Sequence, residues 1–238
     1  MTENTNKDKK LAVLSNDSAG EQTILPCNRE ADNLDDVYKW SQVFPEQVLL
    51  SLARQTGDNL IKKNGGNFEV EEEAVRKENF EDYVTKLLLN IPSHLKEGKD
   101  ENIKKNIYNY VVCCKLISIM IKLYKMRVSE AKSQTCFESE PEEVQKWIFS
   151  TFFVGEGRDR KILKDEKDKA LAMAIVVMWT CFQYKFPAKE MRLAFNKGEK
   201  MFSKMAKRLL GQVMTMKVNE NETARMCILK LPLPRKST

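Results

Sequence analysis

Apolar residues recur at intervals of three and four along most of this 238-residue chain, the spacing that gathers side chains on one face of an α-helix. Only nine glycines and seven prolines are present. The pattern predicts an all-α fold, a compact multi-helix domain with flexible N- and C-terminal arms. The segment that starts at Phe68 is also compatible with a short strand before its helix begins. Helices are expected at residues 35–44, 45–57, 80–91, 103–132, 142–153, 170–182 and 188–210.

The segment 188–210 predicts one helix of about 23 residues, roughly 35 Å long. Pro187 suits the first turn, where its missing N–H costs nothing. Gly198 lies on the apolar line, weakens the helix by about 1 kcal/mol relative to alanine, and marks close packing or a bend. The apolar line consists of Met191, Phe195, Phe202, Met205 and Leu209.

The opposite face of this helix is basic. Residues 185–210 carry eight basic and two acidic side chains, a local charge of +6 that equals the net charge of the whole chain. Such segregation of charge indicates a polyanionic partner, whereas a solvated surface helix usually mixes both signs. The basic residues are Lys185, Lys189, Arg192, Lys197, Lys200, Lys204, Lys207 and Arg208.

Two further stretches could line the same site. The helix at 103–132 has a second basic line that includes Lys115, Lys122 and Lys125. The loop at 155–169 has two glycines and alternating charges, and it could either clamp phosphates or form a solvated linker. It lacks the GxxxxGK[ST] pattern of a phosphate-binding loop. Its candidate phosphate contacts are Arg158, Arg160, Lys161 and Lys164.

The ends of the chain differ from its middle. The N-terminal segment is polar and aperiodic, which is typical of a disordered arm. The C-terminal segment has an apolar run with Pro232 and Pro234, so it forms either a flexible tail or an arm that docks on a neighbouring copy. The expected division is an arm at 1–33, a helical core at 34–218 with possible lobes at about 34–135 and 141–218, and an arm at 219–238.

Residues suited to catalysis or metal binding are sparse. His94 is the only histidine, and the six cysteines include no CxxC pair. We therefore expect no enzyme, no metal and no cofactor. The N-terminus shows no apolar signal region, and the longest apolar run, 170–182, is shorter than the roughly 20 residues of a membrane span. A buried core helix and a cytoplasmic location with reduced thiols are expected.

In its layout the chain resembles the nucleocapsid or coat proteins of RNA viruses, which are mostly helical, with a basic RNA groove and exchanged terminal arms. The resemblance implies sequence-independent binding of single-stranded RNA, self-assembly into a homo-oligomer through the arms, and a place in the virion. Duplex DNA is disfavoured, because the sequence shows no helix-turn-helix, zinc-finger or basic-zipper signature. The alternatives are a helical scaffold or regulator whose basic face meets an acidic protein or an anionic membrane surface, and a small nucleic-acid-processing enzyme.

Overall fold

The structure, a computed structural model, describes residues 24–64, 67–78, 80–97, 99–133, 135–219 and 222–233. This part of the chain is mostly helical, as the apolar spacing predicts, and it also contains two small antiparallel sheets. The expected all-α fold is therefore correct in its helical character and wrong in leaving out the sheets.

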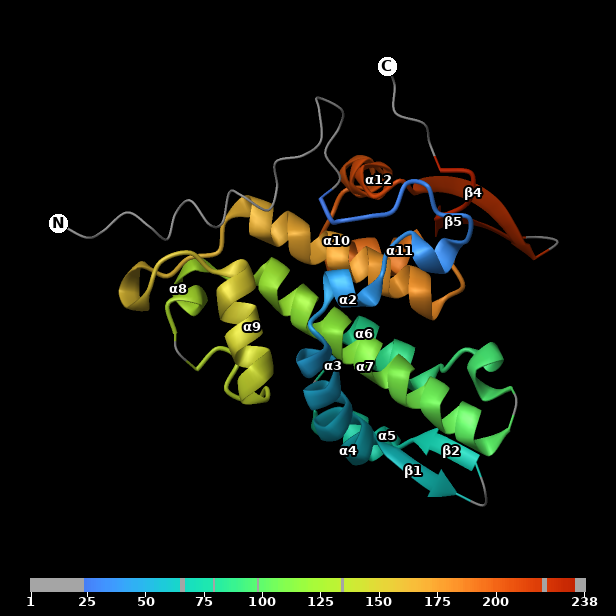
Figure 1. The fold of residues 1–238 in the computed structure, drawn as a ribbon, viewed down its shortest axis with the longest axis horizontal. Helices are drawn as coiled ribbons and strands as arrows, with labels where there is room; N and C mark the ends of the chain where they lie inside the picture. The colour runs from blue at the N-terminus through green and yellow to red at the C-terminus, as the bar shows by residue number, and fades with distance from the viewer. Residues whose placement is uncertain are drawn as a thin grey trace.

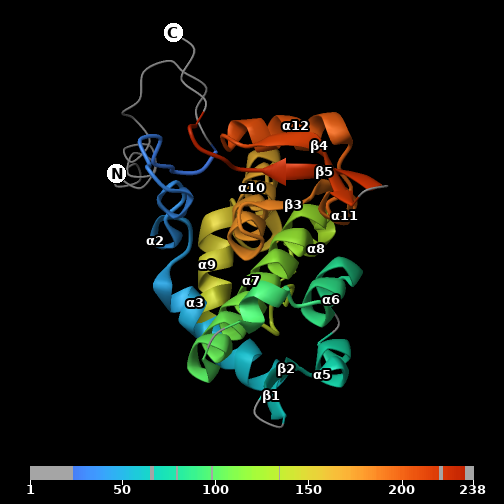
Figure 2. The same ribbon diagram turned by 90° about the vertical axis from the view of Figure 1, so that its right-hand side faces the viewer.

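Two long helices, α7 (Asp100–Lys125) and α10 (Lys164–Cys181), lie against each other at the centre of the molecule (Figures 1 and 2). α7 meets the length and composition of a membrane span, but 72% of its most apolar window is buried inside the molecule, which is the pattern of a core helix. The predicted core run at 170–182 is confirmed. Its helix begins earlier, at Lys164, with Asp165 and Glu166 in the first turn, where acids complement the helix dipole.

Shorter elements from the N-terminal half surround α7. Gly57 lets one of them approach closely, since a Cβ there would lie 2.5 Å from the Tyr108 ring. The elements are η1 (Leu34–Asp36), α2 (Trp40–Val43), α3 (Glu46–Leu52), the π-helix η2 (Ala53–Gly57), α4 (Asp58–Leu60), β1 (Ile61–Asn64), β2 (Asn67–Val70), α5 (Glu72–Lys77), α6 (Asp82–Leu89) and η3 (Ser93–Lys96).

From α7 onward the chain passes through the same order of elements twice. The first unit is α7, extended residues Met126 and Arg127, α8 (Val128–Ala131), α9 (Glu142–Phe152), the short turn η4 (Gly157–Asp159) and the Val154–Lys161 bridge around it. The second unit is α10, β3 (Lys185–Pro187), α11 (Ala188–Ala194), α12 (Glu199–Arg208), β4 (Gln212–Asn219) and β5 (Glu222–Ile228). Each unit is a long helix, an extended piece, two helices and a hairpin, and the first hairpin is reduced to one bridged pair.

The second unit has a complete three-stranded sheet in the order β3-β5-β4. β5 lies in the middle, with Phe186 opposite Cys227 on one side and Val213 opposite Cys227 on the other. Met226, Cys227, Ile228 and Leu229 are buried within their own chain. The predicted C-terminal arm therefore contributes a core strand instead of docking on a neighbouring copy, and residues 234–238 lie outside the described part.

The predicted N-terminal arm is also partly built into the fold. Leu25 is buried, and the Asn28 N–H donates to the Val37 carbonyl at 2.8 Å. Residues 24–33 thus pack on the core, while residues 1–23 lie outside the described part. The division into two lobes, at about 34–135 and 141–218, stays a prediction.

The single helix predicted at 188–210 is wrong. The chain breaks between α11 and α12, where Asn196 takes a left-handed φ of 48° and Gly198 is the extended N-cap of α12. Phe195 before the turn and Phe202 after it are both buried. The two helices pack on the same core, so the apolar spacing continues from one helix to the next and does not reveal the turn between them.

Candidate nucleic-acid interface

α12 is fixed to the core by one apolar face. Phe202, Met205 and Ala206 are buried, and the Tyr38 hydroxyl donates to the Leu209 carbonyl at 2.7 Å. Gly211, directly after the helix, packs so closely on Trp179 that a Cβ would lie 2.3 Å from the indole Cζ2. These contacts hold the helix at one orientation, with its other face at the surface.

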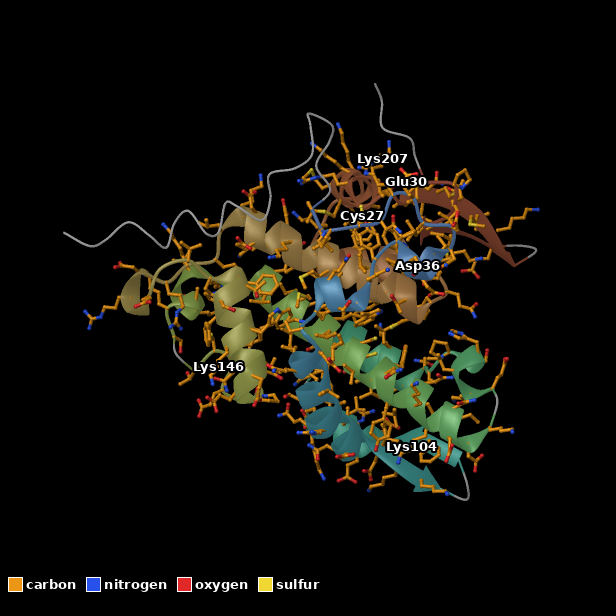
Figure 3. All side chains as sticks on the ribbon, viewed as in Figure 1. Cys27, Glu30, Asp36, Lys104, Lys146 and Lys207 are labelled. Atoms are coloured by element: carbon orange, nitrogen blue, oxygen red, sulfur yellow. The ribbon has the colours of Figure 1, made fainter. Side chains whose placement is uncertain are left out.

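The surface face of α12 is a basic stripe, made of Lys200, Lys204 and Lys207 at positions i, i+4 and i+7. All three side chains are exposed, and within the described part of the chain none of them forms an ion pair. Figure 3 labels Lys207 on the outer side of α12. The exposed thioether of Met201 lies on the same face.

The turn between α11 and α12 is anchored to both long helices. Lys197 Nζ lies 3.8 Å from the Asp168 carboxylate of α10 and 4.8 Å from the centre of the Tyr124 ring of α7. Phe195 packs edge-on against Tyr124 at 5.3 Å, and Arg192 Nη1 donates to the Lys197 carbonyl at 3.1 Å. Arg192 and Lys197, both predicted as surface contacts, therefore also hold the turn in place.

The remaining predicted contacts of residues 185–210 surround the stripe. Lys185 on β3 and Lys189 on α11 are exposed. Arg208 is half-buried beside Asp165 and Asp168 at the start of α10.

The hairpin is joined to the start of α12. Arg225 on β5 forms an ion pair with Glu199, the first residue of α12. Lys217 on β4 is exposed. The helix, the turn and the hairpin are therefore held to one another by side-chain contacts, so the basic stripe is carried by a preformed unit.

The predicted contacts on α7 do not form one exposed stripe. Lys115 is buried and lies 3.0 Å from the Glu140 carboxylate, so it cannot reach a ligand at the surface. Lys125 pairs with Glu81 at 3.0 Å, and the Lys122 ammonium lies 4.7 Å from the centre of the Phe137 ring.

Three of the predicted loop residues belong to the reduced hairpin of the first unit. Arg158 and Lys161 are exposed there, whereas the guanidinium of Arg160 stacks 4.4 Å above the Phe149 ring. Lys164 is the exposed first residue of α10.

In the first unit, α9 takes the place of α12 but has different chemistry. Its N-terminal turn carries the exposed acids Glu142 and Glu143, and α3 packs against it. The Ser51 hydroxyl donates to Glu143 at 3.4 Å. Lys146 of α9, labelled in Figure 3, is paired with Glu142. Of the two units, the second alone presents an open basic helix.

The groups that could do chemistry are poorly suited to it. Burial raises the pKa of the Cys114 thiol well above its ordinary value, and a hydrogen bond with Cys113 together with burial does the same for Cys181. Such thiols stay protonated and are weak nucleophiles. In the described part of the chain, no group of three or more His, Cys, Asp or Glu residues could hold a metal ion.

Two helices joined by a short turn, preceded by a strand and followed by a hairpin that pairs with it, define the winged-helix class of helix-turn-helix proteins. Proteins with this motif place the second helix of the pair in the major groove of DNA. α12 is the second helix of the pair in this chain.

Residues 1–236 match the family model of the A49-like RNA polymerase I associated factors, and the chain belongs to this family. No match was found among the curated proteins.

This membership corrects the function predicted from sequence. The resemblance to viral nucleocapsid and coat proteins is wrong, and so are the predicted RNA coat, virion and homo-oligomer held together by terminal arms. Single-stranded RNA is not supported as the partner, and only a location inside the cell remains consistent with the family. The prediction rested partly on the lack of a helix-turn-helix signature, and the turn at Asn196 supplies that motif.

Proposed function

We propose that this protein is a DNA-binding RNA polymerase I associated factor that acts in the nucleus, with α12 lying in the major groove of duplex DNA. The observation that carries the proposal is the basic stripe of Lys200, Lys204 and Lys207 on the second helix of a helix-turn-helix, which forms no ion pair with any residue that the structure describes. The chain's family supports the association with RNA polymerase I.

The residues of the stripe favour affinity without strong sequence preference. Lysine ammonium groups neutralise backbone phosphates and release counterions, which gives binding that weakens steeply with salt. The side chains that read base edges through paired hydrogen bonds are chiefly arginine, asparagine and glutamine. The exposed face of α12 has none of these, since it consists of Glu199, Lys200, Met201, Lys204 and Lys207.

We also propose that the protein performs no reaction of its own. The thiols of Cys114 and Cys181 are held protonated by their surroundings, and His94, the only histidine, lies on the short η3 turn. A factor that binds DNA beside a polymerase needs affinity and position, and the second unit can supply both.

The proposal is tested by reversing the charge of the stripe. The variant Lys200→Glu, Lys204→Glu, Lys207→Glu should lose binding to a labelled duplex of about 20 base pairs, measured by fluorescence anisotropy. The matched control is Lys86→Glu, Lys96→Glu, Lys105→Glu, which makes the same charge change on exposed lysines of α6, η3 and the start of α7. Equal loss in both variants would show that only net charge matters.

A further inference from the structure

The first unit holds a cavity of about 560 Å³ at the C-terminal end of α7, lined by cations from two elements. Lys122 and Lys125 come from the last turn of α7, and Arg127 comes from the extended residues that follow. Glu81 and Glu130 also line it. The proposed function makes no use of this cavity.

The two carboxylates of the cavity already have donors. Glu81 pairs with Lys125 at 3.0 Å, and Glu130 accepts the Arg127 backbone N–H at 2.6 Å. Lys122 and Arg127 form no ion pair within the described residues. Two cationic side chains at the cavity are therefore available to an anion.

A third cation stands behind the cavity wall. Arg160 stacks its guanidinium on Phe149, and its Nη1 is buried without a hydrogen-bond partner among the described residues. Cys136 lines the cavity, and although burial raises the pKa of its thiol, the charges of Lys122 and Arg160 act in the opposite direction. Both cations thus lie near the same wall. Arg160 is not among the lining residues, so its contribution is the positive charge that it adds behind this wall, which favours an anionic ligand.

The cavity adjoins the anchor of the helix-turn-helix. Tyr124 lies one residue before Lys125, and its ring contacts the Phe195 ring and the Lys197 ammonium of the α11–α12 turn. Lys167 of α10 donates to the Met126 carbonyl at 2.7 Å. The cavity rim and the start of α12 are therefore joined by direct contacts around the end of α7.

We propose that this cavity binds a backbone phosphate of the DNA duplex that α12 engages, through Lys122 and Arg127 with support from Arg160. The inference rests on the proposed function of α12. Guanidinium and ammonium groups are the usual phosphate donors in proteins, and a duplex in contact with α12 carries phosphates on both sides of its groove. Continuity with the helix-turn-helix favours DNA over a phosphorylated protein. The first unit thereby adds a fixed contact on the flanking backbone.

The test compares Lys122→Ala, Arg127→Ala with the charge-preserving Lys122→Arg, Arg127→Lys in the 238-residue chain, over a range of salt concentrations. One lost phosphate contact should make the slope of log affinity against log salt shallower by about 0.9. At 0.1 M salt this corresponds to a loss of about eightfold. The charge-preserving variant should keep most of the affinity, as should the control Lys86→Ala, Lys96→Ala. Circular dichroism melting confirms that each variant is folded.

Three results separate the possibilities. If wild type does not bind duplex, or the α12 triple variant binds as tightly as wild type, the proposed function fails and the inference falls with it. If the α12 variant loses DNA while the cavity variant keeps the wild-type slope and affinity, the inference alone is overturned. If titration with inorganic phosphate, followed by NMR, shows binding that Lys122→Ala, Arg127→Ala removes while DNA affinity stays unchanged, the cavity takes its phosphate from another source and the DNA assignment is overturned.

Discussion

At the scale of single residues, two lysines on α7 lie in opposite environments. Lys115 and Lys122 lie seven positions apart on α7, a spacing that places them on one face. Lys115 is nevertheless buried against Glu140, whereas Lys122 is exposed at the cavity. The sequence could not distinguish them, because Glu140 is 25 positions away and only the folded chain brings it to Lys115.

The Lys115–Glu140 pair should be costly to break from one side. Lys115→Met leaves a buried carboxylate without its cation, and we expect a loss of about 3–5 kcal/mol in the free energy of unfolding by urea. Adding Glu140→Leu should recover most of it. Lys125→Met, which breaks the more exposed pair with Glu81, should cost about 1 kcal/mol or less. Similar costs for Lys115→Met and Lys125→Met would contradict the buried pair.

Buried thiols and phenols should make stability fall at alkaline pH. Burial raises the pKa of Cys114 above its ordinary 9.0 and that of Tyr110 above its ordinary 10.0. The unfolded chain therefore releases these protons at lower pH, so the stabilisation is complete below about pH 9 and declines as pH rises towards the folded values. Urea unfolding should give a smaller free energy at about pH 10.5 than at about pH 7.5. Tyr110→Phe should make this decline smaller, and an unchanged decline would contradict the assignment.

At the scale of elements, the sequence predicted most helices and missed the turn that defines the class. Apolar spacing located α9, which buries one face, and the long apolar stretches located α7 and α10, whose middle parts are buried on all sides. It merged α11 and α12 because Phe195 and Phe202 point into the same core on either side of the turn. Gly198, taken as a weak point in one helix, is the N-cap of the next. A stronger signal was Asn196 two residues earlier, since asparagine tolerates the left-handed conformation.

A turn at Asn196 and a continuous helix through Asn196 predict opposite effects of Asn196→Ala on stability. Asn196→Ala should destabilise the fold by about 1–2 kcal/mol, because alanine disfavours the left-handed φ, and Asn196→Gly should be tolerated. In a continuous helix alanine would instead stabilise and glycine would weaken the helix. Thermal and urea unfolding of the two variants show whether each substitution raises or lowers the free energy of unfolding. Stabilisation by alanine would contradict the helix-turn-helix.

At the scale of the whole molecule, the charge distribution predicted a polyanionic partner for the C-terminal quarter of the chain, and the single-stranded RNA chosen as that partner is wrong. Residues 185–238 carry a net charge of +9 against −3 for residues 1–184, and this excess falls on the second unit. The preference for single-stranded RNA rested on the lack of a helix-turn-helix, zinc-finger or basic-zipper signature, and the turn between α11 and α12 supplies the first of these motifs. Residues 212–228 form β4 and β5, which complete the sheet beside α12.

The two units of the molecule differ in the exposed surface of their third helix, α9 in the first unit and α12 in the second. In the first unit α3 packs against α9, which starts with the exposed acids Glu142 and Glu143, whereas α12 of the second unit is open and basic. Spacing could not reveal this repeat, because the hairpin of the first unit is a single bridge between Val154 and Lys161. The second unit therefore presents one open basic helix, α12, which we propose as the DNA-binding helix.

The most direct test of this account is the salt dependence of duplex binding by wild type and the Lys200→Glu, Lys204→Glu, Lys207→Glu variant. Three lost phosphate contacts should reduce the slope of log affinity against log salt by about 3, with affinity at 0.1 M salt falling by more than about a hundredfold. The control with Lys86, Lys96 and Lys105 changed to glutamate should stay close to wild type. A wild-type slope and affinity in the α12 variant would contradict the assignment of α12 as the DNA-binding helix.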